Sequence, residues 1–187
     1  MNQDSQKIFF TAKNAATSCC FSLAERSLLA AEIQIARIWN QQVTVEDDLI
    51  LPQEVKLIDI HFYFVALRNL YRHLKKVVSD PVFSHLDSEL EALNQKWFKH
   101  YAKGREAFEH IDQRLPGGKH EKRIVEIEEN GIRRRVHYGF SMKRGIFSHS
   151  DESWDIGMNS FTELKTSVLR LIKNIVDSSN KQFVVVK

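Results

Sequence analysis

The stretch that decides the fold runs from Gly104 to Leu115 and reads GREAFEHIDQRL. It closes a helical pattern that begins near Ser84, in which apolar residues recur every three or four positions. The tripeptide Pro-Gly-Gly at 116–118 follows directly and predicts the end of that helix. Within the stretch, Arg105 precedes His110 by five residues. The helix therefore carries a permanent cation and a titratable imidazole near its end.

The same periodicity predicts three further helices, over residues 22–40, 54–78 and 160–178. Ser22, followed three residues later by Glu25, is typical of a capping box at the start of the first one. The 54–78 segment has the widest apolar face, so we expect it to lie at the centre of the core.

The period changes to two between the third and the fourth predicted helix. Residues 123–129 and 132–138 alternate between apolar and charged side chains, and they flank an Asn-Gly pair at 130–131. Asn-Gly between alternating segments is the strongest local signal for a β-hairpin. We therefore expect an inserted β-hairpin over 119–140, followed by an irregular stretch over 139–157.

Length and composition fit this reading. A chain of 187 residues is large enough for one domain over 1–187 with a buried core. Its hydrophobic content of 43% and charged content of 27% are those of an ordinary globular protein. The predicted fold class is mainly α: an antiparallel four-helix bundle with a β-hairpin inserted between the third and fourth helices.

Several classes of protein are disfavoured by the residues that are missing. The two cysteines, Cys19 and Cys20, are adjacent, and no Cys-x-x-Cys motif exists, which argues against a zinc site and for a reducing compartment. The eight histidines show no metal-ligand spacing, so we expect no metal and no cofactor. No signal peptide and no 18-residue apolar run are present, which predicts a cytoplasmic protein without a membrane span.

Positive charge is concentrated in one part of the chain. The net charge is only +3, but residues 119–144 hold eight basic and four acidic side chains. A local excess of this kind is what an anionic partner such as RNA or DNA detects. The candidate nucleic-acid contacts are Arg133, Arg134, Arg135, Lys143 and Arg144. The alternative is cross-strand pairing of these arginines with Glu126, Glu128 and Glu129.

An Arg-x4–6-His motif on the third of four antiparallel helices resembles the HEPN superfamily. The second helix adds Asp59-Ile60-His61-Phe62 with Ala66-Leu67-Arg68-Asn69-Leu70, and the third adds Arg105-Glu106-Ala107-Phe108-Glu109-His110-Ile111-Asp112-Gln113-Arg114-Leu115. The resemblance covers most of the chain except the hairpin. It implies a homodimeric, metal-independent endoribonuclease of toxin or defence type, with RNA as substrate and an antitoxin-like protein as partner.

The resemblance also implies a role for each motif residue. His110 is the acid/base group, and Arg105 clamps the phosphate. Glu109 and Asp112 flank His110 and either orient its imidazole and raise its pKa or are ordinary helix-surface neighbours.

Asp59 and His61 form a polar pair in an otherwise apolar segment of the second helix. Such a pair needs hydrogen-bond partners when it is buried. An Asp59–Arg105 or a His61–Glu109 contact would supply them.

One departure from the family pattern and one geometric constraint keep a second function open. Glu106 stands where active members commonly place Asn or Asp. Five residues on a straight helix span about 140° of rotation, so Arg105 and His110 converge only through a kink, for which Gly104 is available, or through a partner. A second Arg-x4-His copy lies at 68–73. The alternative function is a non-catalytic nucleotide- or partner-binding module that dimerises through its third helix.

Overall fold

The computed structural model describes residues 15–40, 52–109, 125–129, 132–136, 140–143, 145–149 and 152–183. Over these residues the protein is mainly helical, with two small antiparallel sheets. Three long helices are α2 (Ala15–Asn40), α3 (Pro52–Val78) and α7 (Met158–Phe183). The chain between α3 and α7 first forms a fourth helical run and then the five strands.

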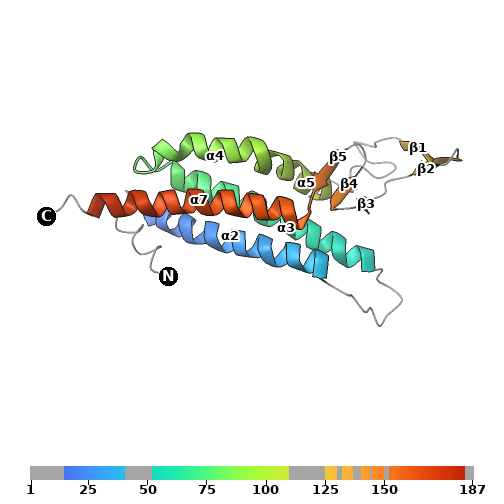
Figure 1. Cartoon of the computed structure of the whole chain (residues 1–187), viewed down its shortest axis with the longest axis horizontal. Helices are drawn as coiled ribbons and strands as arrows, with labels where there is room; N and C mark the ends of the chain where they lie inside the picture. The colour runs from blue at the N-terminus through green and yellow to red at the C-terminus, as the bar shows by residue number, and fades with distance from the viewer. Residues whose placement is uncertain are drawn as a thin grey trace.

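The fourth helical run is built from four consecutive pieces. They are η1 (Ser84–Leu86), α4 (Asp87–Leu93), the π-helical turn η2 (Asn94–Phe98) and α5 (Lys99–Glu109). The strands are β1 (Val125–Glu129), β2 (Ile132–Val136), β3 (Phe140–Lys143), β4 (Ile146–His149) and β5 (Glu152–Asp155). Figure 1 shows the helices lying side by side, with the strands gathered beyond one end.

Polar contacts fix the direction of each helix relative to its neighbours. Arg37 and Asp59 lie 3.2 Å apart at one end of the α2–α3 pair, and the Thr17 hydroxyl donates to Asp80 at the other end, over 2.9 Å. Because the sequence number rises along α3 as it falls along α2, the two helices are antiparallel. This second contact also explains why α2 begins at Ala15, seven residues before the expected start at Ser22: its first turn is held by a tertiary partner.

Helix α7 runs antiparallel to both of its neighbours. Lys96 lies 3.4 Å from Glu163, and Glu89 lies 3.3 Å from Arg170 further along the seam with α4. On the other side, Lys165 pairs with Glu32 of α2. These pairs are exposed and contribute little free energy, but they record the register of the helices.

The core is continuous along the four helical runs. Its largest fully buried side chains come from α2, α3, α5, the turn before η1 and the second sheet: Phe21, Ile35, Ile38, Ile60, Tyr63, Phe64, Leu67, Phe83, Tyr101, Phe147 and Trp154. The central place expected for the 54–78 segment is confirmed, because α3 supplies buried residues along most of its length. No helix among the described residues is both long and apolar enough to cross a membrane.

Gly104, which was available for a kink, does not interrupt the helix. Helix α5 runs through Gly104 without a break, and the irregular turn is η2, which begins ten residues earlier. The glycine is needed for a close approach of two helices: a Cβ at this position would lie 2.7 Å from the Phe64 ring of α3. Absence of a side chain therefore sets the distance between α3 and α5.

The strands form two separate sheets. A two-stranded antiparallel sheet pairs β1 with β2 in the register Val125↔Val136 to Glu129↔Ile132, within the range predicted for a hairpin. The expectation of an irregular stretch over 139–157 is wrong, because β3, β4 and β5 form a three-stranded antiparallel sheet there.

Aromatic hydrogen bonds tie the second sheet to the helices. The Trp154 indole donates to the His100 carbonyl over 3.0 Å, and the Tyr101 hydroxyl donates to the Asp155 carbonyl over 2.5 Å. The Phe147 ring stacks on Phe108 of α5, with ring centroids 5.5 Å apart. The sheet is therefore fixed to α5 along its length, from the first turn to the last.

Gly104→Ala is expected to destabilise the protein by about 1–2 kcal/mol. Alanine gains about 1 kcal/mol over glycine in a helix interior, whereas overpacking a core costs about 1–3 kcal/mol. The clash dominates because Phe64 is itself wedged among Tyr101, Phe108 and Trp154. Urea unfolding measures the difference.

The matched control is Lys103→Ala, an exposed neighbour on the same helix, which should change stability by less than about 0.5 kcal/mol. A Gly104→Ala variant as stable as the wild type would show that the α3–α5 distance does not depend on this contact.

Candidate nucleic-acid interface

A groove of about 510 Å³ lies between α3 and the η2–α5 run. It is lined by residues of both helices: Arg68, Tyr71, Arg72, Asn94, Phe98, Lys99, Ala102, Lys103 and Glu106. Its volume falls in the range of pockets that hold small ligands. Cations from both helices are among the residues that line this groove.

Four cations line the groove in two pairs. Arg68 and Arg72 lie four residues apart on α3, and Lys99 and Lys103 lie four residues apart on α5. Residues at that spacing occupy one face of a helix, about 6 Å apart along its axis. Both walls therefore present two positive charges at matching intervals.

An aromatic contact forms the floor of the groove. Tyr71 of α3 packs on the buried Phe98 of η2, with ring centroids 5.4 Å apart. Lys75 extends the positive charge along α3, since its ammonium lies 5.8 Å from the centre of the Tyr71 ring. The floor is apolar and the rim is basic.

Negative charge at the groove is limited. Glu106 is the one carboxylate among its described lining residues. Glu91 lies beyond the rim, where it accepts hydrogen bonds from Gln95 over 2.5 Å and from Asn94 over 3.3 Å. These bonds lower the pKa of Glu91, so Glu91 stays ionised and holds the Asn94 amide.

The predicted catalytic arginine is not among the residues that line the groove, and it is already paired. Arg105 forms an ion pair with Glu109 on the same helix. Its side chain is only 14% exposed, and its buried Nε has no hydrogen-bond partner among the described residues. Arg105 and Glu109 follow the groove residue Ala102 by three and seven positions, so they continue the same row of α5. His110 and Asp112 lie outside the described residues.

Asp59 has a different partner from the one expected. Its carboxylate is 1% exposed and pairs with Arg37 of α2, while Oδ2 has no hydrogen-bond partner among the described residues. Arg105 pairs instead with Glu109 within α5. The structure therefore places Asp59 at the α2–α3 seam rather than in the candidate site.

His61 lies between two aromatic rings. Its ring centroid is 5.6 Å from that of Phe62 and 5.3 Å from that of Phe108. Its buried Nδ1 has no hydrogen-bond partner among the described residues, so the expected bond to Glu109 is not seen there. Burial lowers the pKa of His61, which keeps the ring neutral near pH 7.

In Figure 1, β1 and β2 lie beyond the second sheet, at a distance from the helices. In the register of the two strands, Glu126 is opposite Arg135 and Glu128 is opposite Arg133. Cross-strand pairing of opposite charges is therefore available to two of the three arginines. Arg134 is opposite Ile127, and Lys143 is opposite Ile146 in the other sheet. Arg144 lies outside the described residues.

Sequence reasoning missed Arg72, Lys99 and Lys103 as members of one site. The available signal was a pair of cations at a spacing of four on each of two helices that were expected to be antiparallel. In the part of the chain that the structure describes, no three His, Cys, Asp or Glu side chains gather into a set that could hold a metal ion.

No family model, no curated protein and no solved structure matches the chain. The HEPN relationship therefore rests on the sequence motifs alone.

The stability of the protein is expected to fall as the pH drops below about 6.5, in part because of His61. Its pKa is lowered in the folded state, so the unfolded chain binds more protons between the folded pKa and the ordinary value of 6.5. His61→Phe removes this difference and should flatten the pH dependence of the unfolding free energy between pH 7.5 and 5. Urea titrations at several pH values measure it.

Some pH dependence will remain in the variant, because burial also lowers the pKa of His73. Identical pH profiles for the wild type and His61→Phe would contradict the assignment of a buried, neutral imidazole.

Proposed function

We propose that this protein binds single-stranded RNA in the groove between α3 and α5. The observation that carries the proposal is the facing pairs Arg68/Arg72 and Lys99/Lys103, with Glu106 as the one described carboxylate between them. Guanidinium and ammonium groups bind phosphate oxygens, and a strand that contacts several of them gains affinity through release of its counterions.

The shape of the groove favours a single strand over a duplex. A volume of about 510 Å³ admits a chain one nucleotide wide, whereas a double helix would touch only the rim. A basic groove with an aromatic floor is also how proteins commonly track single strands. The choice of RNA rather than DNA comes from the HEPN resemblance.

The proposal also covers the architecture of the helices and the hairpin. We propose a HEPN-like antiparallel four-helix bundle with a β-hairpin inserted between the third and fourth helices. The alternating directions of α2, α3, the α4–α5 run and α7 support it. In this description the protein is a cytoplasmic, non-catalytic RNA-binding module.

A second candidate is the metal-independent ribonuclease, with Arg105 as phosphate clamp and His110 as acid/base group. It is supported by the position of Arg105 on the row of α5 that continues the groove. Phosphate binding by Arg105 would require it to leave Glu109, and the carboxylate would then stand beside the substrate. This contact makes binding without cleavage the better-supported function. A toxin role would add an antitoxin-like partner protein.

Binding of a fluorescent oligouridylate should weaken steeply with salt. For single strands the slope of log affinity against log salt is about −0.7 for each phosphate neutralised, so three to four contacts predict about −2 to −3. Arg72→Gln and Lys99→Gln should each make the slope shallower by about 0.7. Fluorescence anisotropy at several salt concentrations measures this.

The control is Lys173→Gln, which removes an equally exposed cation from α7, outside the groove. The proposal fails if all three variants lose the same affinity, because binding would then follow net charge rather than the groove.

Ribonuclease activity is tested in EDTA with the wild type, His110→Ala and Arg105→Ala. The binding proposal predicts intact RNA with all three proteins. Cleavage by the wild type that is lost in both variants, with cyclic-phosphate ends, would establish the second candidate and assign its two groups.

A further inference from the structure

An exposed apolar face lies on the side of the molecule formed by α2 and α7. Leu29 and Ile33 of α2 are 55% and 49% exposed, and Met158 and Leu169 of α7 are each 46% exposed. Leu29 and Ile33 lie one turn apart on the same side of their helix. Large apolar side chains that gather on a surface in this way commonly mark a protein interface.

A shallow groove of about 370 Å³ runs along this face. Apolar and small side chains from both helices line it, including Ile35, Ala36, Met158, Phe161 and Leu169. The charged residues that line it are Glu32 of α2 and Lys165 of α7, which pair with each other. The groove is therefore neutral overall, with one charge of each sign on opposite walls.

The two helices of the exposed face carry the same pattern at the same height, with Leu29 just outside the residues that line the groove. Helices α2 and α7 are antiparallel, and Glu32 is level with Lys165. Leu29 and Leu169 each lie about one turn from that pair in the same direction, and Ala36 and Phe161 lie about one turn from it in the other. Along this face each helix thus presents an apolar residue, a charged residue and an apolar residue in turn.

A twofold axis parallel to α2 and α7, midway between them, brings α2 of one copy opposite α7 of a second copy. Positions along the helix axes do not change in this rotation. It places Glu32 of one copy opposite Lys165 of a second copy and Leu29 opposite Leu169. Opposite charges then meet, and apolar residues meet apolar residues. An isologous interface requires this kind of self-complementarity.

We infer that the α2–α7 face binds a second copy of the chain through this twofold arrangement. The charge pattern selects that occupant. An RNA strand binds to surfaces with net positive charge, which this groove lacks. An unrelated protein would not be expected to carry the same order of apolar and charged residues at the same spacing.

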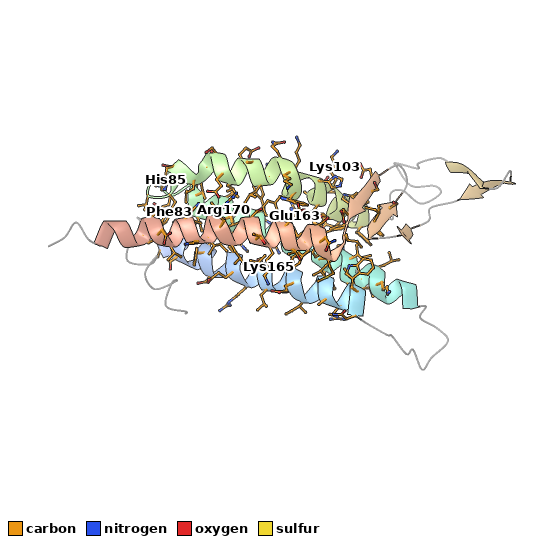
Figure 2. The ribbon with its side chains drawn as sticks, in the orientation of Figure 1. Phe83, His85, Lys103, Glu163, Lys165 and Arg170 are labelled. Carbon is orange, nitrogen blue, oxygen red and sulfur yellow. The ribbon has the colours of Figure 1, made fainter. Side chains whose placement is uncertain are left out.

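The arrangement determines where the basic grooves lie. In the ring of helices α2 contacts α3, α3 contacts α5, and α7 contacts α2 and α4, so the α3–α5 side is opposite the α2–α7 side. Figure 2 shows Lys103 pointing outward from α5, away from Lys165 at the α2–α7 seam. The dimer therefore carries two basic grooves on its outer faces, and the two Arg105 residues do not meet.

Multi-angle light scattering of the full chain at roughly 100 µM tests the inference. The wild type should have twice the mass of the chain, and Ile33→Glu and Leu169→Glu should each give the monomer mass. Phe62→Glu is the matched control: Phe62 is 51% exposed on α3, away from this face, and its variant should stay dimeric. Circular dichroism confirms that each variant is folded.

A monomeric wild type would overturn the inference and leave the face to a different protein. A dimer that Phe62→Glu disrupts and Ile33→Glu does not would overturn it as well, because the copies would then meet through α3.

A mixed disulfide tests the twofold geometry directly. In a background of Cys19→Ser and Cys20→Ala, one chain carries Leu29→Cys and a second chain carries Leu169→Cys. Oxidation of the mixture should favour the mixed disulfide over either homodisulfide. Predominant homodisulfides would contradict the exchange of α2 and α7 across the interface.

Discussion

The contact of Gly104 with the Phe64 ring is the constraint on which the site depends. It lets α5 approach α3 closely enough for Tyr71 to pack on Phe98, and those two rings form the floor of the basic groove. The same approach brings Phe108 against Phe147, which attaches the second sheet to the helices. A side chain at residue 104 would push α5 away from α3. Core packing and the shape of the candidate site therefore both depend on the absence of a Cβ at this position.

The charged side chains of the helices fall into two groups, partly buried ion pairs and exposed cations. Arg37 with Asp59, and Arg105 with Glu109, are partly buried pairs whose remaining buried atoms Asp59 Oδ2 and Arg105 Nε have no hydrogen-bond partner among the described residues. Breaking such a pair leaves a charge in a poorly solvated place, which is costly. The exposed cations Arg72, Lys99 and Lys103 face no such cost when they meet an anionic ligand. The groove cations are therefore more available to an anionic ligand than the predicted catalytic arginine is.

Helical periodicity predicted the long helices because their apolar stripes repeat over many turns. The strands β3 to β5 were missed because each has four residues, too few for alternation to stand out, and because their stability comes from Trp154 and Phe147 packing on α5. Arg105 and Glu109 were singled out from the sequence, but their pairing with each other was not predicted. The groove was not predicted, since it exists only when two cation pairs from separate helices are brought level by the register of α3 and α5. That register depends on Gly104, which the sequence suggested as a kink.

The most direct test of this account is a titration of the isotope-labelled protein with oligouridylate, followed by NMR of the backbone amides. The account predicts that shift changes concentrate on residues 68–75 of α3 and 99–106 of α5, with little change on the α2–α7 face. Shift changes confined to residues 132–144 would move RNA binding to the basic hairpin and its neighbouring strand. A titration without any shift change would contradict RNA binding altogether.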